Sequence, residues 1–300
     1  MDNISTTKEK LIRSKRPRKS KDQENQPGKY DERNTVNDLT GKEWLLLSRS
    51  YWFSEPTVLD KTAYSHPAPF MVKDIENLIQ LFTKKDMLVL DPFVGSGTTL
   101  IAASNTDRKS IGIDLNAEYY ALYQSRLKES QLSSNNSSYI VGDSLHCLDD
   151  IDLVDYIVTS PPYHNILRND SKGTRCNNGK QYRMSARDGV EYYSDLENDI
   201  GNCAEYTEFM DLLFKVMTKA YACLNAKRYI SIIMSDFTVN KKEMPVLGDV
   251  TQKMISIGFE YCGSTVLLQN VKPLYPFGYP YAYKINHHHQ SILTFRKPAL

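Results

Sequence analysis

The chain has 300 residues and a formal net charge of +1, and 41% of its residues are hydrophobic. This length allows one sizeable α/β domain with an insertion, and twenty tyrosines provide material for an aromatic-lined cleft. The chain has no apolar run of membrane-spanning length and no signal-peptide core, so we expect a soluble cytoplasmic protein without a membrane partner. Its five cysteines are scattered and never spaced C-x-x-C, which argues against a disulfide framework and a zinc site.

Residues 1–40 are polar and contain a basic cluster in which the only acid is Glu9. The basic residues are Lys8, Lys10, Arg13, Lys15, Arg16, Arg18, Lys19 and Lys21. This composition predicts a flexible arm ahead of a main domain at residues 41–300. Such an arm could attract DNA phosphates, or it could be a solvated tail that only aids solubility.

The main domain alternates between helical and strand periodicity. We predict helices near 73–82, 100–104, 117–130, 205–224 and 246–257. We predict strands near 87–90, 110–113, 139–141, 154–159, 229–234, 259–268 and 290–295. The alternation indicates an α/β fold with a doubly wound, mostly parallel Rossmann-like sheet and a C-terminal antiparallel strand.

A glycine turn at residues 91–99 joins the first of these strands to a helix, and Gly95 and Gly97 allow a ligand to approach the backbone closely. A lone G-x-G is weak, but Asp114 ends the next strand, where a carboxylate can accept from both ribose hydroxyls. A dinucleotide and a nucleoside cofactor are both compatible with this pattern. The turn has Thr98 and Thr99 instead of a third glycine, and its acid Asp91 suits a cationic cofactor better than a pyrophosphate.

S-adenosylmethionine is such a cofactor, because it carries a sulfonium and an ammonium group. We interpret Asp91 as shaping its methionine end, Asp114 as holding its ribose, and Asp143, after the third strand, as accepting from its adenine amino group. Each acid alone could be a strand-end cap. Three acids at successive strand ends favour a binding site.

The tetrapeptide Ser160-Pro161-Pro162-Tyr163 ends the fourth strand. An exocyclic amine of cytosine or adenine is a poor nucleophile, because its lone pair is delocalised into the ring. The Ser160 hydroxyl and the Pro161 carbonyl could accept its protons and localise that pair, while the Tyr163 ring stacks on the extruded base. These residues are our catalytic candidates, for a direct in-line methyl transfer. The structural alternative is a rigid Pro-Pro turn.

Three segments resemble the amino-methylating DNA methyltransferases of bacterial restriction-modification systems: 66–70, 91–99 and 159–163. With the strand pattern, the similarity covers roughly residues 40–296. It implies S-adenosylmethionine as cofactor, double-stranded DNA as substrate, a site-specific reaction, and a cognate restriction endonuclease as a functional partner. The cofactor positions are then His66, Pro69, Phe70, Asp91, Phe93, Gly95, Ser96, Gly97, Thr98, Thr99, Asp114, Leu115, Asp143 and Ser144.

In this family a serine before Pro-Pro-Tyr is the usual form in N4-cytosine enzymes, so the resemblance favours cytosine N4 over the alternative, adenine N6. Cytosine C5 methylation is disfavoured, because it needs a thiolate and no cysteine here follows a proline. The glycine turn precedes the catalytic tetrapeptide, whereas many relatives have the reverse order, so the motif order resembles a circular permutation. An RNA amino-methyltransferase and a catalytically silent nucleic-acid-binding protein remain as alternatives.

Two further segments are candidates for DNA contact. Residues 164–202 are predicted as an insertion loop that clasps DNA, or else an incidental polar loop, and the DNA-binding candidates there are Arg168, Lys172, Arg175, Lys180, Arg183 and Arg187. Residues 274–284 carry five aromatic side chains among prolines. These rings could wall the base pocket, enter the duplex, or pack the loop onto the core. The run 287–289 of histidines opens a strand, where neighbours point to opposite faces, so we predict no metal site.

Overall fold

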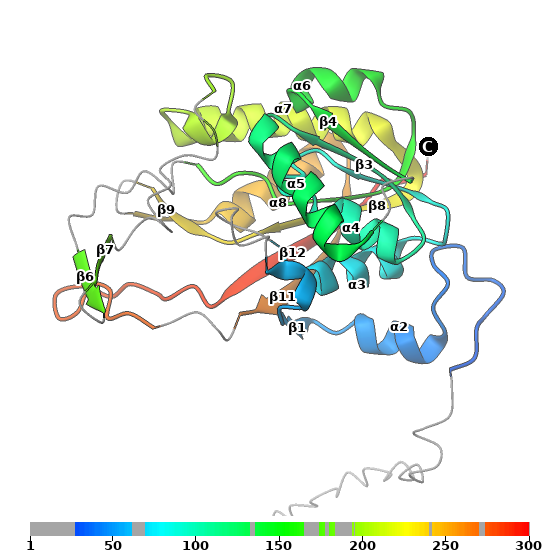
Figure 1. Cartoon of the computed structure of the whole chain (residues 1–300), viewed down its shortest axis with the longest axis horizontal. Helices are drawn as coiled ribbons and strands as arrows, with labels where there is room; N and C mark the ends of the chain where they lie inside the picture. The colour runs from blue at the N-terminus through cyan, green and yellow to red at the C-terminus, as the bar shows by residue number, and fades with distance from the viewer. Residues whose placement is uncertain are drawn as a thin grey trace, which may run out of the picture.

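The computed structural model describes residues 28–61, 70–132, 136–164, 174–177, 180–183, 194, 196–239, 242–269 and 274–299, with backbone only for the two segments between 174 and 183. An eight-stranded sheet with helices on both faces forms the body of the molecule (Figure 1). The strand order is β1-β11-β12-β8-β5-β2-β3-β4. The strands are β1 (Tyr51–Phe53), β2 (Leu88–Asp91), β3 (Lys109–Asp114), β4 (Ser137–Val141), β5 (Val154–Thr159), β8 (Leu224–Met234), β11 (Glu260–Leu268) and β12 (His289–Arg296).

Seven α-helices are described: α2 (Gly41–Leu47), α3 (Val72–Phe82), α4 (Thr98–Asn105), α5 (Ala117–Ser130), α6 (Ser144–Cys147), α7 (Tyr206–Cys223) and α8 (Val246–Ile257). Short 3-10 helices are η1 (Val58–Asp60), η3 (Leu148–Asp150) and η4 (Ile200–Asn202). Two small antiparallel pairs lie outside the main sheet: β6 (Thr174–Asn177) with β7 (Lys180–Arg183), and β9 (Phe237–Val239) with β10 (Lys242–Met244). Among the described helices none is long and apolar enough to cross a bilayer.

The predicted fold class is confirmed. Strands β4, β3, β2, β5 and β8 pair in parallel, β12 is antiparallel to both of its neighbours, and β1 adds in parallel to β11. The strand order reverses between β2 and β5, and ligands of open α/β sheets bind at the carboxyl edge beside such a reversal. The topology therefore predicts a ligand-binding site at the carboxyl edge of the sheet, beside β2 and β5.

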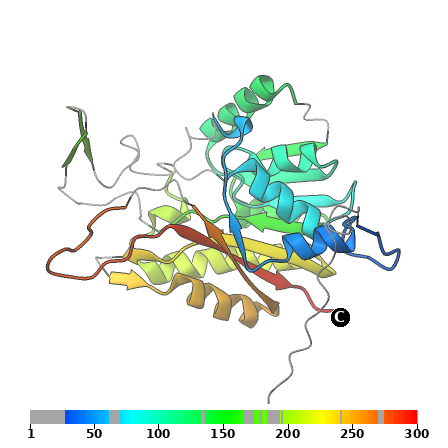
Figure 2. The same cartoon turned by 90° about the horizontal axis from the view of Figure 1, so that it is seen from below.

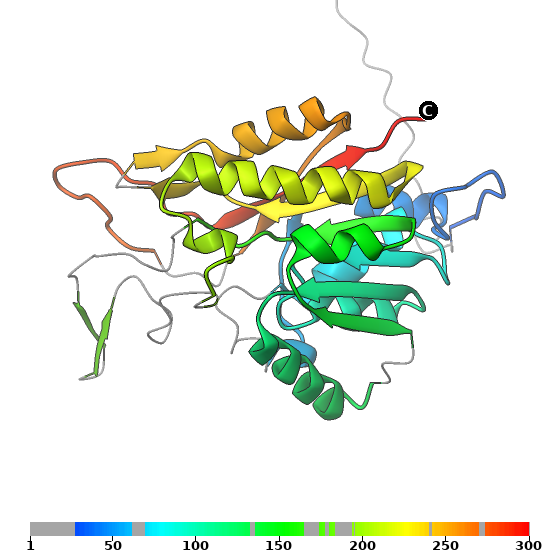
Figure 3. The same cartoon turned by 90° about the horizontal axis from the view of Figure 1, so that it is seen from above.

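Successive strand residues point to opposite faces, and this alternation divides the core into two layers. Leu90 and Ile157 pack in the layer under α7 and α8, whereas their neighbours Val89 and Val158 pack in the layer under α3 and α4. Figure 3 shows α7 and α8 side by side over the first of these faces. Both faces are covered by helices, which explains why the central strands are apolar on both sides.

Some elements differ from the predictions. Strand β8 begins at Leu224 instead of Tyr229, because Leu224 already pairs with Val154 across the sheet. Helix α2, strand β1 and helix α6 were not predicted; α2 has no buried residue and therefore lacks a marked amphipathic period. Residues 1–27 of the predicted arm lie outside the described residues, whereas Asn37 is buried and donates to the Leu81 carbonyl at 2.6 Å. The folded part of the chain thus includes residues ahead of 41.

Candidate active site

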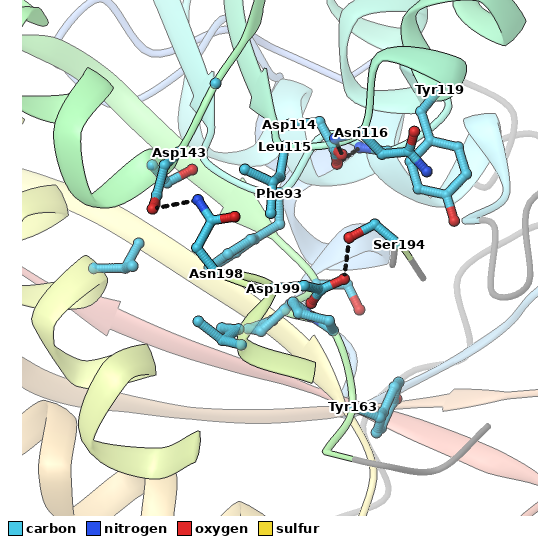
Figure 4. A pocket seen from close by; sticks show the side chains of 18 residues that line it. Phe93, Asp114, Leu115, Asn116, Tyr119, Asp143, Tyr163, Ser194, Asn198 and Asp199 are labelled. Atoms are coloured by element: carbon cyan, nitrogen blue, oxygen red, sulfur yellow. Dashed lines mark hydrogen bonds between the residues drawn. The ribbon is translucent and has the colours of Figure 1, made fainter. Parts of the chain in front are cut away.

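A pocket lies at the carboxyl edge of the sheet and receives residues that follow β2, β3, β4 and β5 (Figure 4). Its wall is completed by residues from α7 and from the segment that leads into η4. The lining residues are Phe93, Gly95, Asp114, Leu115, Asn116, Tyr119, Gly142, Asp143, Ser144, Ser160, Pro161, Pro162, Tyr163, Ser194, Asn198, Asp199, Ile200 and Val216. Two segments that we predicted separately, the glycine turn and the catalytic tetrapeptide, therefore share one cavity.

The glycine turn adopts a conformation that side chains would disturb. Gly95 and Gly97 have φ of 49° and 80°, in the left-handed region that favours glycine. A Cβ atom on Gly97 would lie 2.2 Å from the Tyr123 ring. The Gly95 N–H donates to Asp114 Oδ2 at 2.8 Å, and the Asn116 N–H donates to Asp114 Oδ1 at 2.9 Å. Asp114 thereby holds the turn against β3 and still has lone pairs that face the pocket.

A buried arginine holds the glycine turn in place from the side that faces away from the pocket. Arg126 on α5 is fully buried, and one of its guanidinium nitrogens donates to the Ser96 carbonyl and the Thr98 hydroxyl, both at 2.8 Å. It also reaches the Leu59 carbonyl at 3.4 Å. Burial lowers the pKa of Arg126 to about 10, so it stays charged near neutral pH. The contacts explain why Ser96 and Thr98 point away from the pocket.

Asp91 joins the glycine turn to the catalytic strand. It is only 1% exposed, and its carboxylate accepts from the Thr99 hydroxyl at 2.5 Å and from the Thr159 hydroxyl at 2.7 Å. Thr159 directly precedes Ser160, so this carboxylate sets the distance between the two motifs. Asp91 lies beneath the turn and does not line the pocket.

Asp143 faces the pocket from the end of β4. Its Oδ1 accepts from the Leu145 N–H at 2.9 Å and caps α6, and its Oδ2 accepts from the Asn198 side-chain amide at 3.0 Å (Figure 4). Asn198 comes from the segment that leads into η4. The neighbouring Asp199 is held by the Ser194 hydroxyl at 2.7 Å. The Asn198 side chain thus connects the segment before η4 to Asp143 across the pocket.

The catalytic tetrapeptide contributes all four of its residues to the pocket wall. Tyr163 is 7% exposed, its ring packs edge-on against Phe237 at 5.4 Å, and its hydroxyl accepts from Gln290 Nε2 at 3.1 Å. Ser160 is partly buried, and its hydroxyl makes no hydrogen bond to the residues that the structure describes. The tyrosine is therefore rigidly held, while the serine hydroxyl is available to a ligand.

The predicted site residues fall into three groups. Those that line the pocket are Phe93, Gly95, Asp114, Leu115, Asp143, Ser144, Ser160, Pro161, Pro162 and Tyr163. Those that do not line it are Phe70, which packs on the core layer under α3, and Asp91, Ser96, Gly97, Thr98 and Thr99, which form or support the turn. His66, Pro69, Arg168, Lys172 and Arg187 lie outside the described residues, as do the side chains of Arg175, Lys180 and Arg183 on β6 and β7.

Sequence reasoning missed several lining residues: Asn116, Tyr119, Gly142, Ser194, Asn198, Asp199, Ile200 and Val216. Asn116 caps α5 and Tyr119 lies in its first turn, shortly after Asp114, so the start of a helix after a strand-end acid was a usable signal. The residues from 194 to 200 carried none, because they are polar residues in a stretch that reads as a loop. Only the tertiary fold brings them over the pocket.

The polar lining is acidic. It contains three carboxylates and, among the residues that the structure describes, no Lys or Arg. Such a wall repels a pyrophosphate and attracts a cation. An amide already occupies the Asp143 acceptor, which demonstrates that this carboxylate is oriented to take an N–H from inside the pocket. The donor and acceptor set fits a cationic nucleoside that carries ribose hydroxyls and an exocyclic amine.

Residues 3–125 match a family model described as DNA methylase, for N6 and N4 methylation. The chain is 40% identical over 74 residues to the orphan methyltransferase M.BamHII of Bacillus amyloliquefaciens, covering 25% of this chain and 28% of that one. It is 33% identical over 115 residues to the type II methyltransferase M.BglI of Bacillus subtilis, covering 38% and 32%. The chain is similar to the amino-methylating DNA methyltransferases. The matched segments span about a third of the length of these relatives.

Among solved structures, TrmN from Thermus thermophilus has a TM-score of 0.48 at 15% identity and covers 80% of this chain and 52% of that chain. The family match, together with the parallel sheet and its glycine turn, points to S-adenosylmethionine as the cofactor. This agrees with the acidic pocket, since the cofactor is a cation.

Cofactor affinity is expected to rise with pH. Burial raises the pKa of Asp91 and of Asp114 to about 6, and the nearby carboxylates of Asp91 and Asp199 add to the shift at Asp114. A cationic ligand favours the ionised carboxylates, so binding lowers their pKa values and releases protons. Affinity should therefore increase as the pH rises through about 6, and level off above that value. Calorimetric titration with S-adenosylmethionine in buffers of different ionisation enthalpy measures both effects; an affinity independent of pH in this window contradicts the assignment.

Proposed function

We propose that the chain is a site-specific DNA methyltransferase that modifies the exocyclic amino group of a base, with cytosine N4 favoured over adenine N6. One observation carries the proposal: the glycine turn, Asp114, Asp143 and the tetrapeptide 160–163 line the same pocket. S-adenosylmethionine, when bound, supplies an electrophilic methyl group. The rest of the reaction depends on how this chain's own residues hold the two reactants.

The cofactor half of the pocket is formed by the strands on one side of the reversal. Asp114 would accept from the ribose hydroxyls, and Asp143 would accept from the adenine amino group in place of the Asn198 amide. Gly95, which has no side chain, leaves room for the ligand beside Asp114. The acidic wall would lower the free energy of the bound cation.

The base half is formed by the tetrapeptide at the end of β5. The Ser160 hydroxyl and the Pro161 carbonyl would accept hydrogen bonds from the two amino N–H groups of the base. The nitrogen lone pair would then be localised on the amine instead of delocalised into the ring. The pair Pro161-Pro162 restricts the backbone and thereby orients that carbonyl without cost at the moment of reaction. The proton released by the amine would leave through the same acceptors to water.

These acceptors lie inside a pocket, so they cannot reach an amine in a stacked base pair. We therefore infer that the target base leaves the duplex before it reacts. The ring of Tyr163 is fixed by Phe237 and by Gln290, and it would stack on the extruded base without having to become ordered first. This accounts for a tyrosine that is held at both its edge and its hydroxyl.

The preference for cytosine rests on the serine at position 160, which the resemblance associates with N4 methylation. The name of M.BglI, a type II methyltransferase, supports a role beside a restriction endonuclease with duplex DNA as the substrate, whereas M.BamHII is named an orphan methyltransferase and gives no support for such a partner. The six basic residues from Arg168 to Arg187 remain candidates for contacts to that DNA, on the part of the chain that follows the tetrapeptide.

The test is methyl transfer from tritiated S-adenosylmethionine to unmethylated duplex DNA, with transfer RNA and ribosomal RNA as competing substrates. We expect label in DNA alone, and nucleoside chromatography should identify N4-methylcytosine. N6-methyladenine would overturn the base preference but keep the reaction class. Label in RNA alone, or purified protein that does not take up the cofactor, would overturn the proposal itself.

A further inference from the structure

We propose that residues 274–288, the aromatic finger, enter duplex DNA beside the base to be methylated, and that the Tyr281 ring stacks on bases there. This inference rests on the proposed function. It concerns how the protein holds duplex DNA outside the pocket.

The finger carries aromatic rings that are not part of the core. Tyr279, Tyr281 and Tyr283 are 80%, 95% and 89% exposed. Figures 1 and 2 show this orange-to-red loop reaching out from the body between β11 and β12. For these three rings, the interpretation that the aromatic side chains pack the loop onto the core is therefore wrong, whereas Tyr275 is partly buried and packs on Phe277. Exposed apolar side chains gathered on one element mark an interaction site.

The finger nevertheless has an ordered backbone. The Asn286 side chain bridges the loop, donating to the Tyr275 carbonyl at 2.8 Å and accepting from the Tyr275 N–H at 2.9 Å. The N–H groups of Tyr281 and Ala282 both donate to the Gly278 carbonyl, at 2.8 and 2.7 Å. A structured loop that presents rings to water has already lost the entropy that ordering costs, so contact with a partner is less expensive.

The finger starts at the active site. Because β11 runs parallel to β5, its carboxyl end and the start of β12 lie at the same edge of the sheet as the pocket. Gln269 donates to Gln290 at 2.9 Å, and Gln290 donates to the hydroxyl of Tyr163 at 3.1 Å. The base of the finger is thus two hydrogen bonds from the ring that would hold the extruded base.

The charge of this loop suits a polyanion. Residues 269–288 include Lys272, Lys284, His287 and His288 and contain no Asp or Glu. His287 Nε2 lies 2.7 Å from the Glu243 carboxylate of β10, so the positive charge of the loop sequence comes from its two lysines. Aromatic rings next to lysines are a combination that binds bases by stacking while tolerating the phosphates. A basic protein partner is less well matched, since the loop sequence itself has no carboxylate to pair with its cations. A base that leaves the duplex also leaves a gap, which a projecting ring can fill.

The experiment compares Tyr281→Ala, Tyr281→Phe and the triple variant with alanine at 279, 281 and 283. A fluorescent duplex with one abasic position, the paired duplex and an RNA hairpin serve as probes. Tyr261→Ala is the matched control, because Tyr261 is 44% exposed and lies at the start of β11, at the opposite edge of the sheet. Cofactor binding, measured separately for each variant, reports whether the pocket is intact.

We expect wild type and Tyr281→Phe to prefer the abasic duplex, and Tyr281→Ala to bind it about 5- to 100-fold more weakly, as for loss of one stacked base. The dependence of affinity on salt should not change, because no phosphate contact is removed. Unchanged affinity in Tyr281→Ala and in the triple variant overturns the proposal while the proposed function stands. Loss confined to the RNA hairpin overturns it too, and failure of the wild type to bind duplex DNA overturns both.

Discussion

Ser160→Ala is expected to lower kcat by about 100- to 1000-fold, the usual cost of deleting one preorganised polar group from the reacting centre. Ser160 lines the pocket beside the glycine turn, and its hydroxyl makes no hydrogen bond within the described part of the chain. Its removal leaves the amine with a single acceptor and the lone pair delocalised in the base ring. Single-turnover transfer to DNA measures the chemical step directly.

The same variant should bind S-adenosylmethionine within about threefold of wild type, because no ribose or adenine contact is removed and threefold is under 1 kcal/mol. The matched control is Ser256→Ala, since Ser256 is exposed on α8 and its hydroxyl bonds only to the Lys253 carbonyl among the residues that the structure describes. We expect that control to retain full turnover. A Ser160→Ala enzyme that turns over normally would remove the serine from the mechanism.

Asp114→Ala is expected to weaken cofactor binding by about 100-fold, as for loss of two hydrogen bonds to a charged acceptor. The change also leaves the Gly95 and Asn116 N–H groups without their acceptor, so the glycine turn loosens as the ribose contact disappears. Asp114→Asn should weaken binding as well, because both carboxylate oxygens accept and one of them becomes a donor. Calorimetric titration of the cofactor measures both variants.

Asp149→Asn separates a general charge effect from the loss of this contact. Asp149 is exposed and pairs with Lys219 at 2.5 Å, outside the pocket lining. It should leave both cofactor affinity and thermal stability nearly unchanged, because exposed ion pairs contribute little. If Asp114→Ala binds the cofactor as tightly as Asp149→Asn does, Asp114 has no role in the site.

Local periodicity was sufficient for the elements that carry a strong pattern and a clear stop. Helix α5 and strand β5 have the predicted bounds, the first because Asn116 caps its start and its residues favour a helix, the second because two prolines end the ladder. Strand β8 was underestimated, because its first residues pair only with a neighbour from another part of the chain. Pairing between distant strands leaves no local signal.

The candidate site divides in the same way. Acids at strand ends and a proline pair can be recognised in the sequence, and ten of the predicted positions do line one pocket. The orientation of each side chain cannot be recognised in the sequence. Asp91 was expected beside the cofactor, yet its carboxylate is 1% exposed and binds two threonine hydroxyls beneath the turn. Burial of this kind depends on what the neighbouring strand presents.

By itself, the sequence determined the parallel α/β class, the strand ends that carry acids and the Pro-Pro stop after Ser160, because each depends on residue type within a few positions. Tertiary structure alone decided that Asn198 reaches Asp143, that Arg126 braces the turn, and that the finger's tyrosines stay in water. Those outcomes depend on which surfaces meet once the sheet is assembled, and packing between distant segments follows from the balance of burial over the whole fold.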